Sequence, residues 1–213
     1  MIKIIPAILT KDPKDLEDKL KKLKGLVDWV QIDVLDGKFV NNNSIQPEDL
    51  PQVLTKNFNL EIHLMVQNPE NYFKECQNIG AKRVIFHAEA VENLHNLLNR
   101  AKKFNFKVGL ALNPETPVKQ IQPYLNQINL VILLGVNPGF QGQKFIPSVL
   151  NKIKFFKQLA PKIKIEIDGG INLSNIKQIA KAGADYLVIG NALFGSKNFK
   201  ERLRQLNEKL KKG

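Results

Sequence analysis

The feature that most constrains the fold of this chain is a regular alternation of two kinds of segment. Short runs rich in Val and Ile, typical of buried strands, alternate with longer segments in which Leu recurs at helical spacing among lysines. Strands that alternate with helices indicate a parallel sheet, because parallel neighbours need a crossover connection between them. The expected strands span residues 2–5, 29–34, 60–66, 83–87, 107–112, 130–136, 163–167 and 186–189.

A helix is expected after each of these strands. The expected helices span residues 13–26, 47–56, 68–79, 91–104, 116–125, 147–159, 173–182 and 198–211. Eight strand–helix units of similar length, with no linker between them, predict a single (β/α)8 TIM barrel domain of the α/β class over residues 1–213. An open doubly wound sheet is not supported, because no G-x-G-x-x-G fingerprint follows the first strand.

Composition narrows the location and the kinds of partner. The single cysteine, Cys76, excludes an internal disulfide framework and fits a reducing cytoplasm, which is the expected location. No apolar run approaches the ~20 residues that span a membrane, so no membrane partner is expected. The net charge is +12, but the lysines are spread along the whole chain and form no single block with aromatic residues. We therefore expect no nucleic-acid partner; a basic surface also attracts an anionic small substrate.

Three residues with metal-binding side chains lie near the ends of expected strands. Asp33, His63 and Asp168 belong to the second, third and seventh strands, and function in such a barrel sits at the carboxyl ends of its strands. Carboxylates in a barrel interior are costly unless they are compensated. We therefore expect these three side chains to hold a divalent metal. Carboxylate oxygen and neutral imidazole suit Zn, Fe(II), Mn or Co, and the residues do not choose among them.

The other histidines and two large apolar residues leave alternatives open. His87 is either a partner that orients a metal ligand or a packing residue, whereas His95 lies within an expected helix and should be exposed. Met65 and Phe140 either fill the core or cover a substrate.

Glycines follow both the seventh and the eighth expected strands. They occur in Asp168-Gly169-Gly170 and in Gly190-Asn191. A glycine lets backbone N–H groups approach an anion closely, and the loops after these two strands are the usual phosphate position in such barrels. The pair of loops therefore indicates a phosphate site.

Four blocks of sequence together resemble those of a known family. They are IDVLDG at 32–37, HLMV at 63–66, VNPGFQGQKF at 136–145 and EIDGG at 166–170. In this order, within a match that runs from about residue 5 to 194, they resemble the ribulose-phosphate 3-epimerase family. The resemblance implies a ribulose-phosphate-binding barrel and an isomerase of the pentose phosphate pathway. Its reaction would be metal-dependent epimerisation of D-ribulose 5-phosphate to D-xylulose 5-phosphate at C3, and the protein would be a homo-oligomer.

The resemblance also implies roles for individual residues. Asp33 and Asp168 would be the two acid/base groups that remove and return the C3 proton through an enediolate, and with His63 they would hold the metal. Gln31 stands where the family usually has a histidine ligand; its carbonyl oxygen is a poorer metal ligand than imidazole. Contacts with the sugar or its phosphate are implied for Ala7, Met65, Gly139, Phe140, Gly142, Gly169, Gly170, Gly190 and Asn191.

The sequence departs from the family pattern at five positions. Besides Gln31, Ala7 replaces a serine, Gly135 a residue with a hydroxyl, Gln141 a glycine and Asn191 a serine. Changes around the sugar keep open an epimerase or isomerase of a different ketose phosphate. The change at Gln31 keeps open a barrel that binds a phosphosugar without turning it over.

Overall fold

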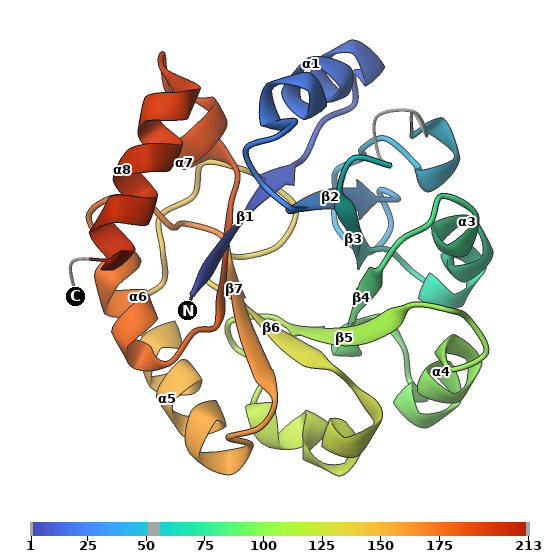
Figure 1. Cartoon of the computed structure of the whole chain (residues 1–213). Helices are drawn as coiled ribbons and strands as arrows, with labels where there is room; N and C mark the ends of the chain where they lie inside the picture. The colour runs from blue at the N-terminus through green and yellow to red at the C-terminus, as the bar shows by residue number, and fades with distance from the viewer. Residues whose placement is uncertain (1, 51–55, 212–213) are drawn as a thin grey trace.

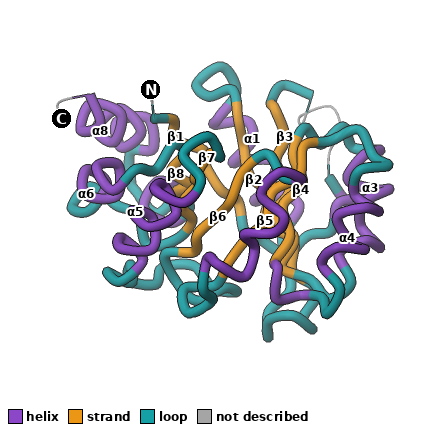
Figure 2. The backbone as a smooth tube through the Cα atoms, turned by 90° about the horizontal axis from the view of Figure 1, so that it is seen from below, coloured by secondary structure: helices purple, strands orange, loops and turns teal. Residues whose placement is uncertain are grey.

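Eight parallel strands close into a barrel in the order β1 to β8. The computed structural model describes residues 2–50 and 56–211. Each strand pairs with the next, and β1 pairs with β8 to close the sheet. Figure 1 shows the helices as an outer ring around the strands, and Figure 2 shows the same chain turned by 90°. The predicted (β/α)8 barrel is confirmed.

The strands lie close to their expected positions. They are β1 Lys3–Ile8, β2 Trp29–Leu35, β3 Asn59–Met65, β4 Arg83–His87, β5 Lys107–Leu112, β6 Leu130–Leu134, β7 Lys164–Asp168 and β8 Tyr186–Ile189. β1 is longer than the expected 2–5. Pro6 lacks an N–H but does not end the strand, because Ala7 and Ile8 remain in register with β2.

Helices follow the strands with some differences from expectation. The α-helices are α1 Pro13–Leu23, α3 Phe73–Asn78, α4 Leu94–Ala101, α5 Val149–Leu159, α6 Ile176–Ala182, α7 Asn191–Phe194 and α8 Phe199–Lys211. Short 3-10 helices are η1 Pro47–Asp49, η2 Pro69–Tyr72, η3 Ala88–Ala90 and η4 Val118–Gln127. The four-residue α7, directly after β8, was not predicted.

Three expected helices were wrong in type or extent. The expected helix 68–79 begins as the 3-10 helix η2 and is α-helical only over α3. The segment 116–125 forms the 3-10 helix η4 instead of an α-helix, and Pro123 inside it provides no N–H for an α-helical hydrogen bond. Of the expected helix 47–56, only η1 is helical among the described residues, and 51–55 lie outside them.

The helices pack on the barrel through apolar stripes. In α1, Leu16, Leu20 and Leu23 recur at helical spacing and are fully buried. The Asp12 side chain accepts a hydrogen bond of 2.9 Å from the Lys14 N–H and caps this helix. Burying one leucine stabilises the fold by about 1.5–3 kcal/mol, so such stripes fix the ring of helices on the strands. Within residues 2–50 and 56–211, every helix is too short or too polar to cross a bilayer.

A buried ion network lies inside the barrel, deeper than the strand ends. Arg83 donates from Nε to Glu61 and from Nη2 to Glu166 Oε2, the latter at 3.1 Å. The guanidinium also lies over the rings of Trp29 and Tyr186, 4.6 and 5.1 Å from their centroids. Burial, and then the nearby Glu61 charge, raise the pKa of Glu166 above its ordinary value. Arg83 was not predicted to lie here.

Asp185 joins the start of β8 to β7 and α5. Its carboxylate contacts Lys164 Nζ at 2.7 Å and Lys157 Nζ at 3.2 Å, and it accepts a hydrogen bond from the Ile165 N–H at 3.1 Å. Burial alone would raise the pKa of Asp185, but the hydrogen bonds of Lys164 and Ile165 lower it below its ordinary 3.8.

Asp185→Asn is therefore expected to destabilise the protein at pH 7 by about 1 kcal/mol, the upper value for a partly exposed ion pair. Because the folded pKa lies below the unfolded one, this stabilisation is present above pH 3.8 and is lost as the pH falls through the folded pKa. Urea unfolding of both proteins at pH 7 and near pH 3 measures the difference. A difference that stays constant down to pH 3 would contradict the assignment.

Candidate active site

A cavity of about 290 Å³ opens at the carboxyl ends of the strands. Apart from Gln31, the predicted site residues all line it: Ala7, Asp33, His63, Met65, Gly139, Phe140, Gly142, Asp168, Gly169, Gly170, Gly190 and Asn191. The structure therefore brings together residues from β1, β2, β3, β7 and the loops after β6, β7 and β8. The cavity has the location at which barrels of this type bind small molecules.

Asp33, His63 and Asp168 converge at the floor of this cavity. Asp33 and His63 are register partners on β2 and β3, so their side chains leave the sheet on the same face. His63 Nδ1 lies 3.3 Å from Asp33 Oδ1 and 3.4 Å from Asp168 Oδ2. One ligand atom from each of the three residues can be chosen so that all lie within 4.8 Å of one another. Two carboxylate oxygens and one imidazole nitrogen at this spacing form a possible metal site.

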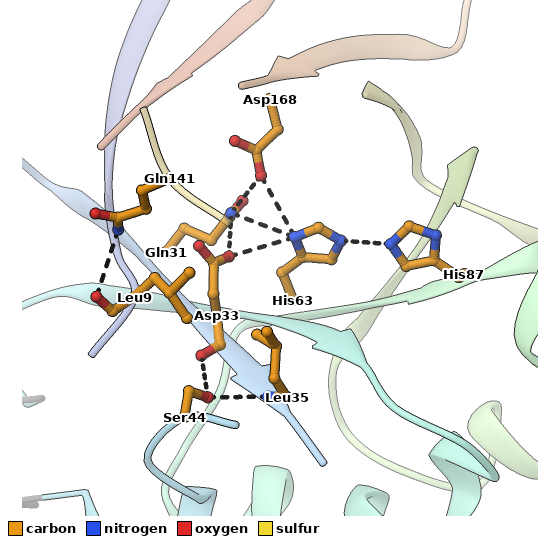
Figure 3. A network of polar contacts seen from close by, with 9 residues as sticks. All are labelled: Leu9, Gln31, Asp33, Leu35, Ser44, His63, His87, Gln141 and Asp168. Carbon is orange, nitrogen blue, oxygen red and sulfur yellow. Dashed lines mark hydrogen bonds and ion pairs between the residues drawn. The ribbon is translucent and has the colours of Figure 1, made fainter. Parts of the chain in front are cut away.

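Gln31 faces the same point from beneath. It is fully buried on β2, two residues before Asp33, and it does not line the cavity. Its Nε2 donates to Asp33 Oδ1 at 2.7 Å and to Asp168 Oδ2 at 2.8 Å, and lies 3.5 Å from His63 Nδ1 (Figure 3). Its Oε1 is buried and has no hydrogen-bond partner in the described structure.

The carboxylates and the imidazole strongly affect one another's protonation. Burial alone would lower the pKa of His63, but hydrogen bonds to Asp168 and Asp33 and their charges raise it to about 10. Burial, together with the negative charge of Asp168, raises the pKa of Asp33. An imidazolium between two carboxylates is the favoured state of the metal-free site near neutral pH.

His87 lies directly behind His63. Its Nε2 is 3.1 Å from His63 Nε2, and the two rings are nearly parallel, with centroids 5.2 Å apart. On the other side, His87 Nδ1 is 3.4 Å from Glu89 Oε2, and Glu89 Oε1 accepts a hydrogen bond from the Asn113 N–H. Burial lowers the pKa of His87, which favours a neutral ring whose Nε2 can accept a hydrogen bond from the His63 Nε2–H. Of the two alternatives for His87, this geometry supports the partner that orients His63. His95 is exposed, as expected.

The loop after β6 covers one side of the cavity. Asn42 donates to the Gly139 carbonyl at 2.7 Å, and Gln143 Nε2 donates to the carbonyls of Asn137 and Phe140 at 2.7 and 2.9 Å. Met65 is buried in the cavity wall, whereas the Phe140 side chain is 57% exposed. Phe140 is therefore not a core residue.

Gln141 extends from this loop across the mouth of the cavity. Its Nε2 donates to the Leu9 carbonyl after β1 at 3.4 Å, and it lies 3.6 Å from the place where a Cβ on Gly190 would sit (Figure 3). Gln141 therefore connects the loop after β6 to the end of β1, close to the glycine after β8. The cavity lining also includes Lys144, a cationic residue of the 136–145 block that was not predicted as a site residue.

Packing explains two glycines at the rim. A Cβ on Gly135 would lie 2.5 Å from the Gly169 carbonyl oxygen and 2.7 Å from the Phe145 ring. A larger residue fits at Gly135 only if these neighbours move. Gly170 has φ +71°, and a Cβ there would lie 2.6 Å from the backbone N of Phe145.

Gly170→Ala is expected to destabilise the protein more than Gly80→Ala. Both glycines have positive φ, +71° and +77°, but a Cβ at Gly80 meets nothing within 4 Å. Gly80→Ala should cost about 1–2 kcal/mol, from backbone strain alone. Gly170→Ala adds a clash with backbone and should cost more than this control. Urea unfolding of the two variants checks the ranking, and equal losses would show that the contact with Phe145 relaxes freely.

Comparison with known proteins identifies the family. Residues 3–194 match the sequence profile of the ribulose-phosphate 3 epimerase family. Among curated relatives, the ribulose-phosphate 3-epimerase of Bacillus subtilis (strain 168) is 39% identical over 213 residues, which cover 97% of this chain and 98% of that protein. The chain belongs to the ribulose-phosphate 3-epimerase family. The enzyme of the same name from Escherichia coli (strain K12) is 34% identical, with 98% and 96% of the two chains covered.

Membership in the ribulose-phosphate 3-epimerase family confirms the resemblance and the predicted isomerase class. Solved structures show the same fold at low identity. A 3-hexulose-6-phosphate synthase superimposes with a TM-score of 0.73 at 17% identity, over 98% of this chain and 100% of that one. Orotidine 5'-phosphate decarboxylase from Pyrococcus horikoshii OT3 superimposes with a TM-score of 0.70 at 16% identity, over 98% of this chain and 99% of that one. At these identities the likeness concerns the barrel alone.

Proposed function

We propose that this member of the family interconverts D-ribulose 5-phosphate and D-xylulose 5-phosphate by epimerisation at C3. The observation that supports this most directly is the meeting of Asp33 and Asp168 at the floor of a cavity that has glycine-rich loops at its rim. Inversion of a carbon next to a ketone needs one group to remove a proton and a second group to return one on the opposite face. Two carboxylates from β2 and β7, on either side of the Gln31 amide, provide such a pair.

The two carboxylates differ in surroundings. The Asp33 side chain is 10% exposed and that of Asp168 is 16% exposed, so both reach the cavity although they are largely desolvated. Burial raises the pKa of Asp33, which makes it a stronger base than an exposed aspartate. In our proposal Asp33 and Asp168 exchange the roles of base and acid when the direction of the reaction is reversed.

A divalent metal fits the residues present. Asp33, His63 and Asp168 would hold it with two carboxylate oxygens and one imidazole nitrogen. The Gln31 amide lies beside these three residues, and its Oε1 is buried without a hydrogen-bond partner. When bound, Zn, Fe(II), Mn or Co would supply positive charge beside the oxyanion that develops as C3 loses its proton. His87 would keep the His63 ring oriented so that Nδ1 faces the carboxylates.

The phosphate would lie at the other end of the cavity. The loops after β7 and β8 bring Gly170, Gly190 and Asn191 to its rim. In our proposal the backbone N–H groups of these residues bind the phosphate, since the two glycines have no side chain that would hinder a close approach. Met65 would exclude water from the reacting carbon, and Phe140 would cover the sugar from the loop after β6.

The test is a proton NMR assay in deuterium oxide with purified protein and added Mn, Fe(II), Co or Zn. We expect the C3 proton of D-ribulose 5-phosphate to exchange with solvent while D-xylulose 5-phosphate forms. A panel of hexulose 6-phosphates measures specificity, because Ala7 and Gln141 alter the cavity at its mouth. Faster exchange with a hexulose phosphate would favour the alternative substrate. Binding without exchange for every sugar would leave a phosphosugar-binding barrel and reject the proposal.

A further inference from the structure

The Gln31 amide nitrogen lies where the three candidate metal ligands converge. Nε2 is 2.7 Å from Asp33 Oδ1, 2.8 Å from Asp168 Oδ2 and 3.5 Å from His63 Nδ1. The same three residues form the possible metal site. Figure 3 shows the amide nitrogen joined to both carboxylates and to the imidazole. An NH2 group has partial positive charge, so in this structure it takes a position suited to a cation.

The two carboxylates determine this orientation of the amide. With its carbonyl turned toward them, Gln31 would place a third oxygen against the two carboxylate oxygens, and only the His63 Nδ1–H would lie among the three. With its NH2 turned toward them, each carboxylate accepts one charge-assisted hydrogen bond. The orientation leaves Oε1 buried with no hydrogen-bond donor, which is unfavourable. Two charge-assisted hydrogen bonds to the carboxylates outweigh this cost.

A divalent cation between the carboxylates reverses this preference. The NH2 hydrogens and a cation would compete for the same carboxylate lone pairs and would repel each other. The unpartnered Oε1 would then gain a favourable contact if it faced the cation. Oε1 and Nε2 exchange places by rotation about the last side-chain torsion, which has a broad energy profile, so the β2 backbone need not move.

We propose that Gln31 is a metal-responsive positioning residue, whose NH2 group bridges Asp33 and Asp168 in the metal-free protein and whose carbonyl oxygen turns toward a divalent cation bound by Asp33, His63 and Asp168. The inference rests on the metal-binding part of the proposed function. It assigns to Gln31 two successive tasks. The side chain first keeps the two carboxylates together without metal, and it then becomes a fourth protein ligand.

The test follows the side-chain amide of Gln31 by ¹H–¹⁵N NMR in the full chain during titration with Zn²⁺. The Gln31 signals are identified by their loss in Gln31→Glu, or in Gln31→Met if the first variant does not fold. We expect both amide protons to move upfield on Zn²⁺ binding, because they leave their carboxylate acceptors. Gln46 is the matched control, since its NH2 donates to the carbonyls of Leu35 and Ser44 at 3.1 and 2.8 Å and should not shift.

A second measurement is the Zn²⁺ affinity of Gln31→Glu, by competition with a chelating dye. The glutamate keeps an oxygen and removes the competing NH2, so we expect binding roughly tenfold tighter or more, within the range for changes beside metal ligands. Zn²⁺ that shifts the His63 ring signals but not the Gln31 amide, or an unchanged affinity in Gln31→Glu, would overturn the inference. So would a wild-type protein that binds no Zn²⁺.

These outcomes are separate from those of the proposed function. A Gln31 amide that responds to Zn²⁺ in a protein with no C3 proton exchange would support this inference and reject the epimerase. Conversely, C3 exchange with an amide that ignores bound Zn²⁺ would keep the epimerase and reject the role of Gln31.

Discussion

Asp168→Asn is expected to lower the rate of epimerisation by about 10²–10⁴-fold, the usual contribution of a general acid or base. The carboxamide cannot take up a proton at neutral pH, so one face of C3 loses its partner. The fold should persist, because the new side-chain carbonyl can still accept the hydrogen bond that Gln31 Nε2 now gives to Asp168 Oδ2 at 2.8 Å. Initial rates in both directions and thermal unfolding of the variant measure the two effects.

The proposed pair of bases also predicts how the residual activity is distributed. Asp168→Asn should still exchange the C3 proton of one epimer slowly with deuterium, because Asp33 remains on the other face. Asp33→Asn should do so for the opposite epimer. Asp28→Asn, the same change at an exposed position, is the matched control and should leave the rate unchanged. Near-wild-type epimerisation by Asp168→Asn would show that this carboxylate is neither base nor acid.

Arg83→Met is expected to destabilise the protein by about 3–5 kcal/mol, the cost of removing one partner from a buried ion network. Arg83 is the cation between Glu61 and Glu166 in the barrel interior, and its side chain is 6% exposed. Without it, Glu61 must remain charged without a partner or take up a proton. Equilibrium unfolding in urea measures the loss.

Two further variants test whether the lost stability comes from an unpaired buried carboxylate. Arg100→Met removes an arginine that contacts Glu70 at 3.1 Å but is 62% exposed, so its cost should stay below about 1 kcal/mol. Adding Glu61→Gln to Arg83→Met removes the uncompensated carboxylate and should restore part of the stability. Similar losses for Arg83→Met and Arg100→Met would mean that the interior network contributes no more than a surface pair.

The buried ion network of Arg83, Glu61 and Glu166 was not predicted from the sequence. Residues two apart on a strand face the same way, so a His87 that orients a metal ligand in the barrel implies that Ile85 and Arg83 also face inward. That signal was present, but an arginine at the start of a strand is usually a surface residue. Only the closed barrel brings Arg83 to Glu166, because β4 and β7 are separated by two other strands around the ring.

The type of the helix near residues 116–125 was also not determined by the sequence pattern. The periodicity of residues 116–125 indicates a helix, but periodicity alone does not distinguish an α-helix from a tighter 3-10 helix. Pro123 lies inside the η4 segment Val118–Gln127, where its ring and its missing N–H disfavour a continuous α-helix, but they do not by themselves select the 3-10 form.

The sequence by itself determined the barrel and the place of the two carboxylates and the histidine in it. Eight alternations of strand and helix leave few other folds, and in such a fold the carboxyl ends of the strands meet, so that Asp33, His63 and Asp168 had to lie near one another. Only the tertiary structure decided how a side chain at this place in the barrel is oriented and which atoms it contacts. The sequence placed Gln31 beside the ligands, but the positions of two carboxylates from distant strands turned its NH2 inward and left its oxygen without a partner. The direction of a hydrogen bond depends on the atoms around it, and those come together only when the barrel closes.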